Sequence, residues 1–208
     1  MRPTSTTSCR SDRASRSAVR IVVGRPVYDR SRLIELIQSL ALARGQFTLA
    51  SGKTATYYLD CRRVTLDSEG ARLIGEGILD RLERHWPDAV GGMAIGADPI
   101  TGAVITLASL RGRPLKGFIV RKEAKAHGTG RDVEGPVTGG ERCVILEDVV
   151  TTGGSSWKAI ERVEAFGMKV EGVLAVVDRL EGAADAFAAR GCAFASLLTI
   201  RDLGLDAP

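Results

Sequence analysis

Residues 144–156 read VILEDVVTTGGSS, and this stretch decides how the rest of the chain is interpreted. An apolar run, Val144–Leu146, ends in the adjacent acids Glu147 and Asp148, and Thr, Gly and Ser residues follow. In an open α/β sheet, ligands bind beyond the carboxyl ends of the strands. We therefore expect a strand to deliver the two acids to that edge, and a helix to begin just after the small polar residues.

The start of that helix suits a phosphate group. Its first amides have no partner inside the helix, and they combine with the helix dipole to attract an anion. Two glycines let the backbone approach closely, three hydroxyls add donors, and the two carboxylates suit adjacent sugar hydroxyls or a divalent cation. The alternative is a turn whose polar residues are incidental. The segment predicted to hold a ribose 5-phosphate is Glu147, Asp148, Val149, Val150, Thr151, Thr152, Gly153, Gly154 and Ser155.

Short apolar strands alternate with helices from residue 89 onward. Strands are expected at 89–96, 117–120, 143–148, 170–178 and 192–200, and helices at 99–110, 154–166 and 182–190. This alternation predicts an α/β fold, with a mostly parallel sheet flanked by helices. Upstream, helices are expected at 30–43, capped by Asp29, and at 68–84, with an extended segment at 54–66. We expect one domain over 26–208 with a small N-terminal appendage.

The basic charge of the chain is concentrated at its N-terminus. The 208 residues carry a net charge of +4, yet residues 1–25 hold six arginines and one acid, which leaves −1 for the rest. The Ser- and Arg-rich composition predicts a disordered extension or an over-long start; a transit peptide is the alternative. A near-neutral body is a poor footprint for nucleic acid, and no apolar run is long enough for a membrane span. Four widely spaced cysteines fit a reducing compartment, here the cytoplasm.

A second stretch, FIVRKEAKAHGTGRDVEG (118–135), is basic and rich in glycine. Seven Lys or Arg residues lie between Arg111 and Arg131, with a single acid, Glu123, and one histidine, His127. A solvated charged hairpin is the ordinary interpretation of such a run. Next to a phosphate site, we instead expect a flexible lid that brings positive charge to a pyrophosphate leaving group.

Both stretches resemble the type I phosphoribosyltransferases. VILEDVVTTGGSS is similar to their loop for phosphoribosyl diphosphate (PRPP). RKEAKAHGTG (121–130) and FTLASGKTATYYLDCRRV (47–64) are similar to the catalytic loop and N-terminal hood of the orotate phosphoribosyltransferases, and VVDR (176–179) matches their last strand and base-binding arginine. The resemblance runs from about Asp29 to Leu203. It implies transfer of ribose 5-phosphate from PRPP to orotate, giving orotidine 5′-monophosphate and pyrophosphate in pyrimidine synthesis.

The resemblance also implies roles for individual residues. The diphosphate would be contacted by Arg121, Lys122, Lys125 and His127. The catalytic residues would be Lys125, Asp148, Arg121 and His127. Thr151 and Arg179 would bind orotate, whose planar carboxylate suits the fork of an arginine. Mg²⁺ would arrive with PRPP, with Asp148 as the candidate protein contact. The lid would reach the active site of the partner subunit, so a homodimer is implied, with no nucleic acid or membrane partner.

Some positions depart from the family pattern or stay open. Ala50 stands where many members have Lys, and Asp98 and Pro99 stand where many have a basic residue in the loop at 95–102. Backbone amides at Gly96 and Ala97 could still hold a phosphate there. Tyr57 and Tyr58 suit either the base site or core packing. Two rival functions are another nucleobase phosphoribosyltransferase, and a non-catalytic PRPP-binding regulator that binds nucleic acid.

Overall fold

The computed structural model describes residues 27–48, 54–123 and 132–206. Six strands form the central sheet in the order β5-β4-β3-β6-β7-β8, and all neighbours are parallel except β5, which runs antiparallel to β4. The strands are β3 (Ala89–Met93), β4 (Lys116–Val120), β5 (Val133–Glu134), β6 (Arg142–Val150), β7 (Lys169–Asp178) and β8 (Ala193–Thr199). The α/β fold with a mostly parallel sheet is therefore confirmed.

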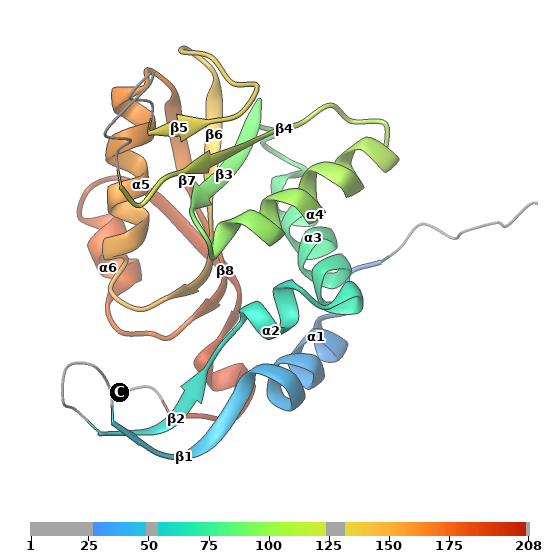
Figure 1. The fold of residues 1–208 in the computed structure, drawn as a ribbon, viewed down its shortest axis with the longest axis vertical. Coiled ribbons are helices and arrows are strands. Elements are labelled where there is room, and N and C mark those ends of the chain that lie inside the picture. Colours follow the sequence, from blue (N-terminus) through green and yellow to red (C-terminus); the bar gives the residue numbers. More distant parts are fainter. Residues whose placement is uncertain (1–26, 49–53, 124–131, 207–208) are drawn as a thin grey trace, which may run out of the picture.

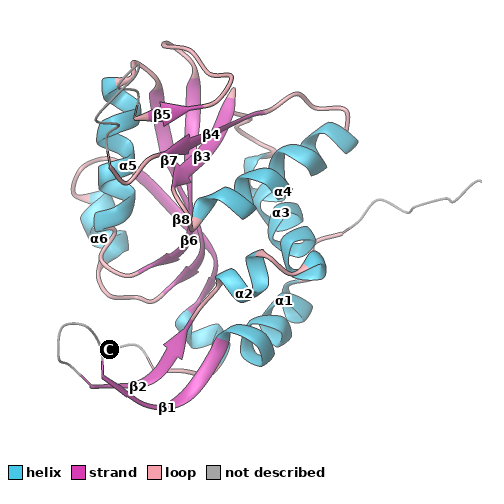
Figure 2. Ribbon diagram, in the orientation of Figure 1, coloured by secondary structure: helices cyan, strands magenta, loops and turns pink. Residues whose placement is uncertain are grey.

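Helices cover both faces of this sheet (Figures 1 and 2). One face carries α3 (Ser68–Leu82) and α4 (Ala97–Leu110), and the other carries α5 (Gly154–Ala165) and α6 (Ala183–Ala188). Side chains alternate across a strand, so Leu146 joins the core under α3 and α4 while Ile145 joins the core under α5 and α6. Burial on both faces explains the continuous apolar runs seen in the sequence.

The N-terminal part of the described chain forms a small hood beside the carboxyl edge of the sheet (Figure 1), and its buried residues join the core under α3 and α4. It contains α1 (Arg30–Leu36), a π-helical turn η1 (Ile37–Ala41), the antiparallel pair β1 (Leu42–Thr48) and β2 (Thr54–Leu59), and α2 (Arg62–Thr65). A short C-terminal turn, η2 (Ile200–Leu203), follows β8, and Gln38 Nε2 in η1 donates to the Leu203 carbonyl at 3.1 Å. The C-terminal end of the fold therefore contacts the hood.

Two expectations for the hood were wrong in detail. The helix expected at 30–43 begins as predicted, with Asp29 Oδ1 accepting from the Arg32 amide at 3.0 Å, but it ends at Ala41 because the next residues pair with β2. The segment 54–66 is extended only to Leu59. The Asp60 carboxylate accepts from the Arg62 amide at 3.2 Å, and this local bond favours a turn that becomes α2.

The strand order places a topological switch point between β3 and β6. From β3 the chain crosses through α4 to β4 on one side, and from β6 it crosses through α5 to β7 on the other. Ligands of open α/β sheets bind outside the carboxyl ends of the strands at such a point. Among the helices that the structure describes, none combines the length and apolar character needed to cross a bilayer. The expected tail, residues 1–25, lies outside the described residues.

Candidate active site

A cleft of about 360 Å³ lies at this switch point. Its floor is the end of β6, because the pairing of β3 with β6 stops at Gly91 and Ile145 while β6 continues to Val150. The strand therefore carries both acids, and it ends at Val150, two residues beyond the end of the strand expected at 143–148. The walls come from the hood, the end of β3 and its loop, the second residue after β4, and the start of α5. The residues that line the cleft are Tyr58, Leu59, Asp60, Cys61, Arg62, Met93, Ala94, Ile95, Gly96, Lys122, Glu147, Asp148, Val149 and Ser155.

The loop after β3 passes very close to Asp148. A Cβ atom added at Gly96 would lie 2.8 Å from Asp148 Oδ1, so any other residue here would push the carboxylate out of its place. The same oxygen accepts the Val149 amide at 2.8 Å, which holds the carboxylate against its own strand. The peptide bond between Ala94 and Ile95 in this loop is cis. Asp148 is thus fixed at the junction of β6 and the β3–α4 loop.

Glu147 is the more deeply placed acid, with only 6% of its surface exposed. Burial raises its pKa to about 7, and the neighbouring charge of Asp148 adds to the effect. The hydroxyl of Ser156 donates to Glu147 Oε2 at 3.2 Å and partly opposes that rise. A buried acid next to a second carboxylate, with so few donors around it, would be stabilised by a ligand that brings hydroxyl groups or a cation.

The turn after β6 leaves the start of α5 open. Gly153 has a φ of +84°, and a Cβ there would lie 2.9 Å from the ring of Phe187, so this position needs glycine. A Cβ at Gly154 would meet nothing within 4 Å. No side chain of the described residues caps this helix, so its first amides have no side-chain partner. These features match the phosphate cradle expected from the sequence.

Arg179 follows β7 and lies beside that turn. Its backbone amide donates to the Val150 carbonyl at 2.9 Å, which places it next to the end of β6. Its side-chain Nε donates to the Tyr57 hydroxyl at 3.2 Å and forms an ion pair with Glu181 at 2.9 Å. A guanidinium at the carboxyl edge of the sheet can bind a planar carboxylate.

Arg121 and Lys122, the two basic residues that begin the predicted lid segment, have different surroundings. Arg121 Nε donates to Glu134 Oε1 at 3.0 Å, whereas Lys122 lines the cleft. Arg162 on α5 donates to the carbonyls of both residues, at 3.1 Å for Lys122, and so ties the chain leaving β4 to the helix that starts at the turn. These contacts hold the start of the segment predicted to be a lid against α5, and Lys122 lies in the same cleft as the acid pair.

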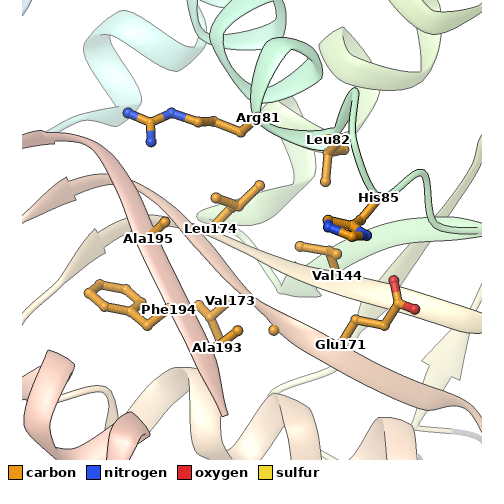
Figure 3. A pocket seen from close by; sticks show the side chains of 11 residues that line it. Arg81, Leu82, His85, Val144, Glu171, Val173, Leu174, Ala193, Phe194 and Ala195 are labelled. Atoms are coloured by element: carbon orange, nitrogen blue, oxygen red, sulfur yellow. The ribbon is translucent and has the colours of Figure 1, made fainter.

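A second cavity, of about 480 Å³, lies at the other end of the strands (Figure 3). Arg81 and His85 line it from α3 and the turn that follows, and Leu174 and Phe194 contribute to its largely apolar floor. It is formed by the amino-terminal halves of β7 and β8, away from the acids and the helix start. The cleft at the switch point is therefore the candidate active site.

Comparison with known proteins agrees with this geometry. No family model matches the chain. The orotate phosphoribosyltransferase of Rhodopirellula baltica is 57% identical over 184 residues, which cover 86% of this chain and 95% of that protein.

The chain belongs to the orotate phosphoribosyltransferase family. The crystal structure of the Mycobacterium tuberculosis H37Rv orotate phosphoribosyltransferase in complex with Fe(III) dicitrate is similar, with a TM-score of 0.76 and 43% identity over 85% of this chain and 99% of that one. The complex of the same enzyme with PRPP gives a TM-score of 0.73 and 38% identity, covering 85% and 99% of the two chains.

Within this orotate phosphoribosyltransferase fold, most of the residues expected from the sequence lie together. Glu147, Asp148, Val149, Ser155 and Lys122 line one cleft. Val150, Thr151, Thr152, Gly153 and Gly154 form the adjoining end of β6, the turn and the first residue of α5. Arg179 lies next to them, and Arg121 is one residue from the cleft but pairs with Glu134. Lys125, His127 and Ala50 lie outside the described residues. The roles of all these residues remain predictions.

Sequence reasoning missed the contribution of the hood residues 59–62 in this family member. Asp60 and Arg62 form a two-bond pair at the cleft wall, with Arg62 Nε to Asp60 Oδ1 at 2.7 Å and Nη2 to Oδ2 at 3.0 Å. An acid two residues before an arginine was the available signal, but only the fold shows that Arg62 lies near the charge of Asp148. Asp98, in contrast, is a half-buried residue in the first turn of α4, and burial raises its pKa.

Proposed function

We propose that the cleft transfers ribose 5-phosphate from PRPP to orotate in a Mg²⁺-dependent reaction, carried out in the cytoplasm by a homodimer whose lids cross between subunits. One observation carries this proposal. An acid pair with one buried member, an uncapped helix start and an arginine suited to a carboxylate meet at a single switch point. These three features match the ribose, the 5-phosphate and the carboxylate of orotate in that order.

The chemistry requires opposite charges at the two ends of the reacting bond. The C1–oxygen bond of PRPP breaks, and its electron pair leaves on pyrophosphate. A ring nitrogen of orotate gives the pair for the new C1–nitrogen bond and releases its proton. Positive charge develops on the sugar, where Glu147 and Asp148 stabilise it, and negative charge develops on the diphosphate, where Lys122 and the lid residues Lys125 and His127 act.

The protein residues fit Mg²⁺ only together with substrate. Within residues 27–48, 54–123 and 132–206, no group of three or more His, Cys, Asp or Glu side chains could hold a metal ion. Mg²⁺ commonly uses one or two carboxylates and completes its coordination with substrate phosphates and water. Asp148 would supply that carboxylate. When bound, the ion would neutralise charge on the diphosphate.

The main test is an ultraviolet assay of orotate consumption with PRPP, with and without EDTA. We expect turnover that stops on chelation and returns with added Mg²⁺. Adenine or guanine consumed in place of orotate would favour another nucleobase phosphoribosyltransferase. Absence of turnover with any base, together with tight nucleic-acid binding by a chain that lacks residues 1–25, would favour the non-catalytic regulator.

A subunit-mixing experiment tests the shared lid. Lys125→Ala damages only the lid and Asp148→Asn only the cleft, so each homodimer should be nearly inactive. If lids cross between subunits, a mixed dimer has one intact site, and an equal mixture should regain about a quarter of wild-type activity. If each lid serves its own subunit, mixing restores nothing. Light scattering on the same samples establishes whether dimers form at all.

A further inference from the structure

The side chain of Arg179 is contacted at its Nε atom by two other side chains. Nε pairs with Glu181 Oε1 at 2.9 Å and donates to the Tyr57 hydroxyl at 3.2 Å. The guanidinium carbon also lies 5.1 Å from the centroid of the Tyr57 ring. Among the side chains that the structure describes, none accepts a hydrogen bond from Nη1 or Nη2. The Nε edge of the guanidinium is therefore occupied, whereas its Nη1–Nη2 end donates to no described side chain.

An unusual backbone turn brings Glu181 back onto Arg179. The residue between them, Leu180, has a φ of +59°, and it is the only non-glycine residue in the described chain with a positive φ. This left-handed conformation is costly for a residue with a Cβ atom. The carboxylate of Asp178, a residue only 4% exposed, accepts the Leu180 amide at 2.8 Å and braces the turn. Strained residues of this kind persist where the surrounding structure fixes them, often at ligand sites.

We propose that Glu181 is a positioning residue that, with Tyr57, holds the Nε edge of Arg179 so that the carboxylate of orotate binds end-on through Nη1 and Nη2. The inference rests on the proposed function of Arg179. An arginine can offer a carboxylate either its Nε–Nη2 edge or its Nη1–Nη2 end. With the edge taken, only the end remains, and the plane of the bound base is fixed relative to the cleft.

The opposite role for Glu181 is competition. In that case its carboxylate would occupy the site of the substrate carboxylate, and orotate would have to displace it. The two roles predict effects of opposite sign. Loss of a positioning group weakens orotate binding, because the freed guanidinium samples other rotamers. Loss of a competitor strengthens binding.

Steady-state kinetics and calorimetric titration of orotate on the full chain distinguish these roles. We expect Glu181→Ala to raise both the KM and the Kd for orotate about tenfold, the loss of one charge-assisted contact. The KM for PRPP and kcat should change by less than about twofold, and Glu181→Gln, which keeps an acceptor oxygen, should recover most of the loss. Glu161→Ala, an exposed glutamate on α5, is the matched control and should leave every constant unchanged.

Each outcome has a distinct meaning. Unchanged or tighter orotate binding by Glu181→Ala, in an enzyme whose wild type turns orotate over, overturns the positioning role alone. A wild type that does not use orotate overturns the proposed function, and the inference with it. A structure of the orotate complex with the carboxylate on the Nε edge of Arg179 would also refute end-on binding.

Discussion

Two neighbouring glycines allow the phosphate cradle to be tested separately from the stability of the fold. Gly153 needs its left-handed φ of +84°, and a Cβ there would lie 2.9 Å from the Phe187 ring. That ring is fully buried, and its centroid lies 5.0 Å from those of both Trp157 and Phe194, so it has little freedom to move. Gly154 faces open space, and its backbone lies outside the left-handed region.

Substitution by alanine should therefore have different consequences at the two positions. Gly153→Ala combines about 1–2 kcal/mol for the left-handed backbone with about 1–3 kcal/mol for overpacking against Phe187. A loss of about 2–5 kcal/mol lowers the melting temperature of a chain of this size by about 4–20 °C. Gly154→Ala should change stability by less than about 0.5 kcal/mol, because nothing contacts the new methyl group.

Activity is expected to follow a different order from stability. The methyl group of Gly154→Ala projects into the space where the 5-phosphate would meet the first amides of α5, so the KM for PRPP should rise about tenfold or more. Melting curves and PRPP saturation kinetics on both variants provide the comparison. If Gly154→Ala binds PRPP as the wild type does, the phosphate is not held at this helix start, and the assignment of the cradle is wrong.

Three further predictions concern charged groups. Lys125→Ala should lower kcat about 100-fold and change the KM for PRPP much less, because the lid acts on charge that develops during reaction; unchanged turnover would refute the lid assignment. The raised pKa of Glu147 means that the folded state favours the protonated acid, so stability falls as pH rises toward about 7. In urea melts, Glu147→Gln should be more stable than the wild type at pH 8 by up to about 3 kcal/mol, with no difference below about pH 5; a pH-independent difference would contradict this cause. Glu76, fully buried on α3, pairs with Arg111, so Glu76→Ala should cost about 3–5 kcal/mol in the same melts, and the double change Glu76→Leu with Arg111→Met should recover most of that loss.

The features that the sequence predicted well are those fixed over short distances. The apolar run, the acid pair and the glycine turn at 144–156 determine a strand, its exit and the next helix without help from the rest of the chain. The structure confirms this order in β6 and α5. The alternation of strands and helices also determined the fold class, because strands buried on both faces have few alternatives.

The features that the sequence could not predict depend on contacts between distant segments. The Tyr57 hydroxyl accepts from Arg179, 122 residues away, and nothing near Tyr57 separates a base-site tyrosine from a core one. The high pKa of Glu147 depends on burial by neighbouring elements, which the pattern of acids alone does not reveal. The early end of the first helix likewise follows from the pairing of β1 with β2.

The early end of the pairing between β3 and β6 explains how opposite charges come to face each other in one cleft. Lys122 follows β4, the acid pair lies on β6, and β3 separates these strands in the sheet. β3 stops pairing with β6 at Gly91, opposite Ile145, and the loop that follows β3 passes Asp148 at Gly96, which has no side chain. A longer β3 would pair with Glu147 and Asp148 and place a peptide ladder where the sugar must bind. The catalytic arrangement therefore depends on where a neighbouring strand stops, as much as on the acids and bases themselves.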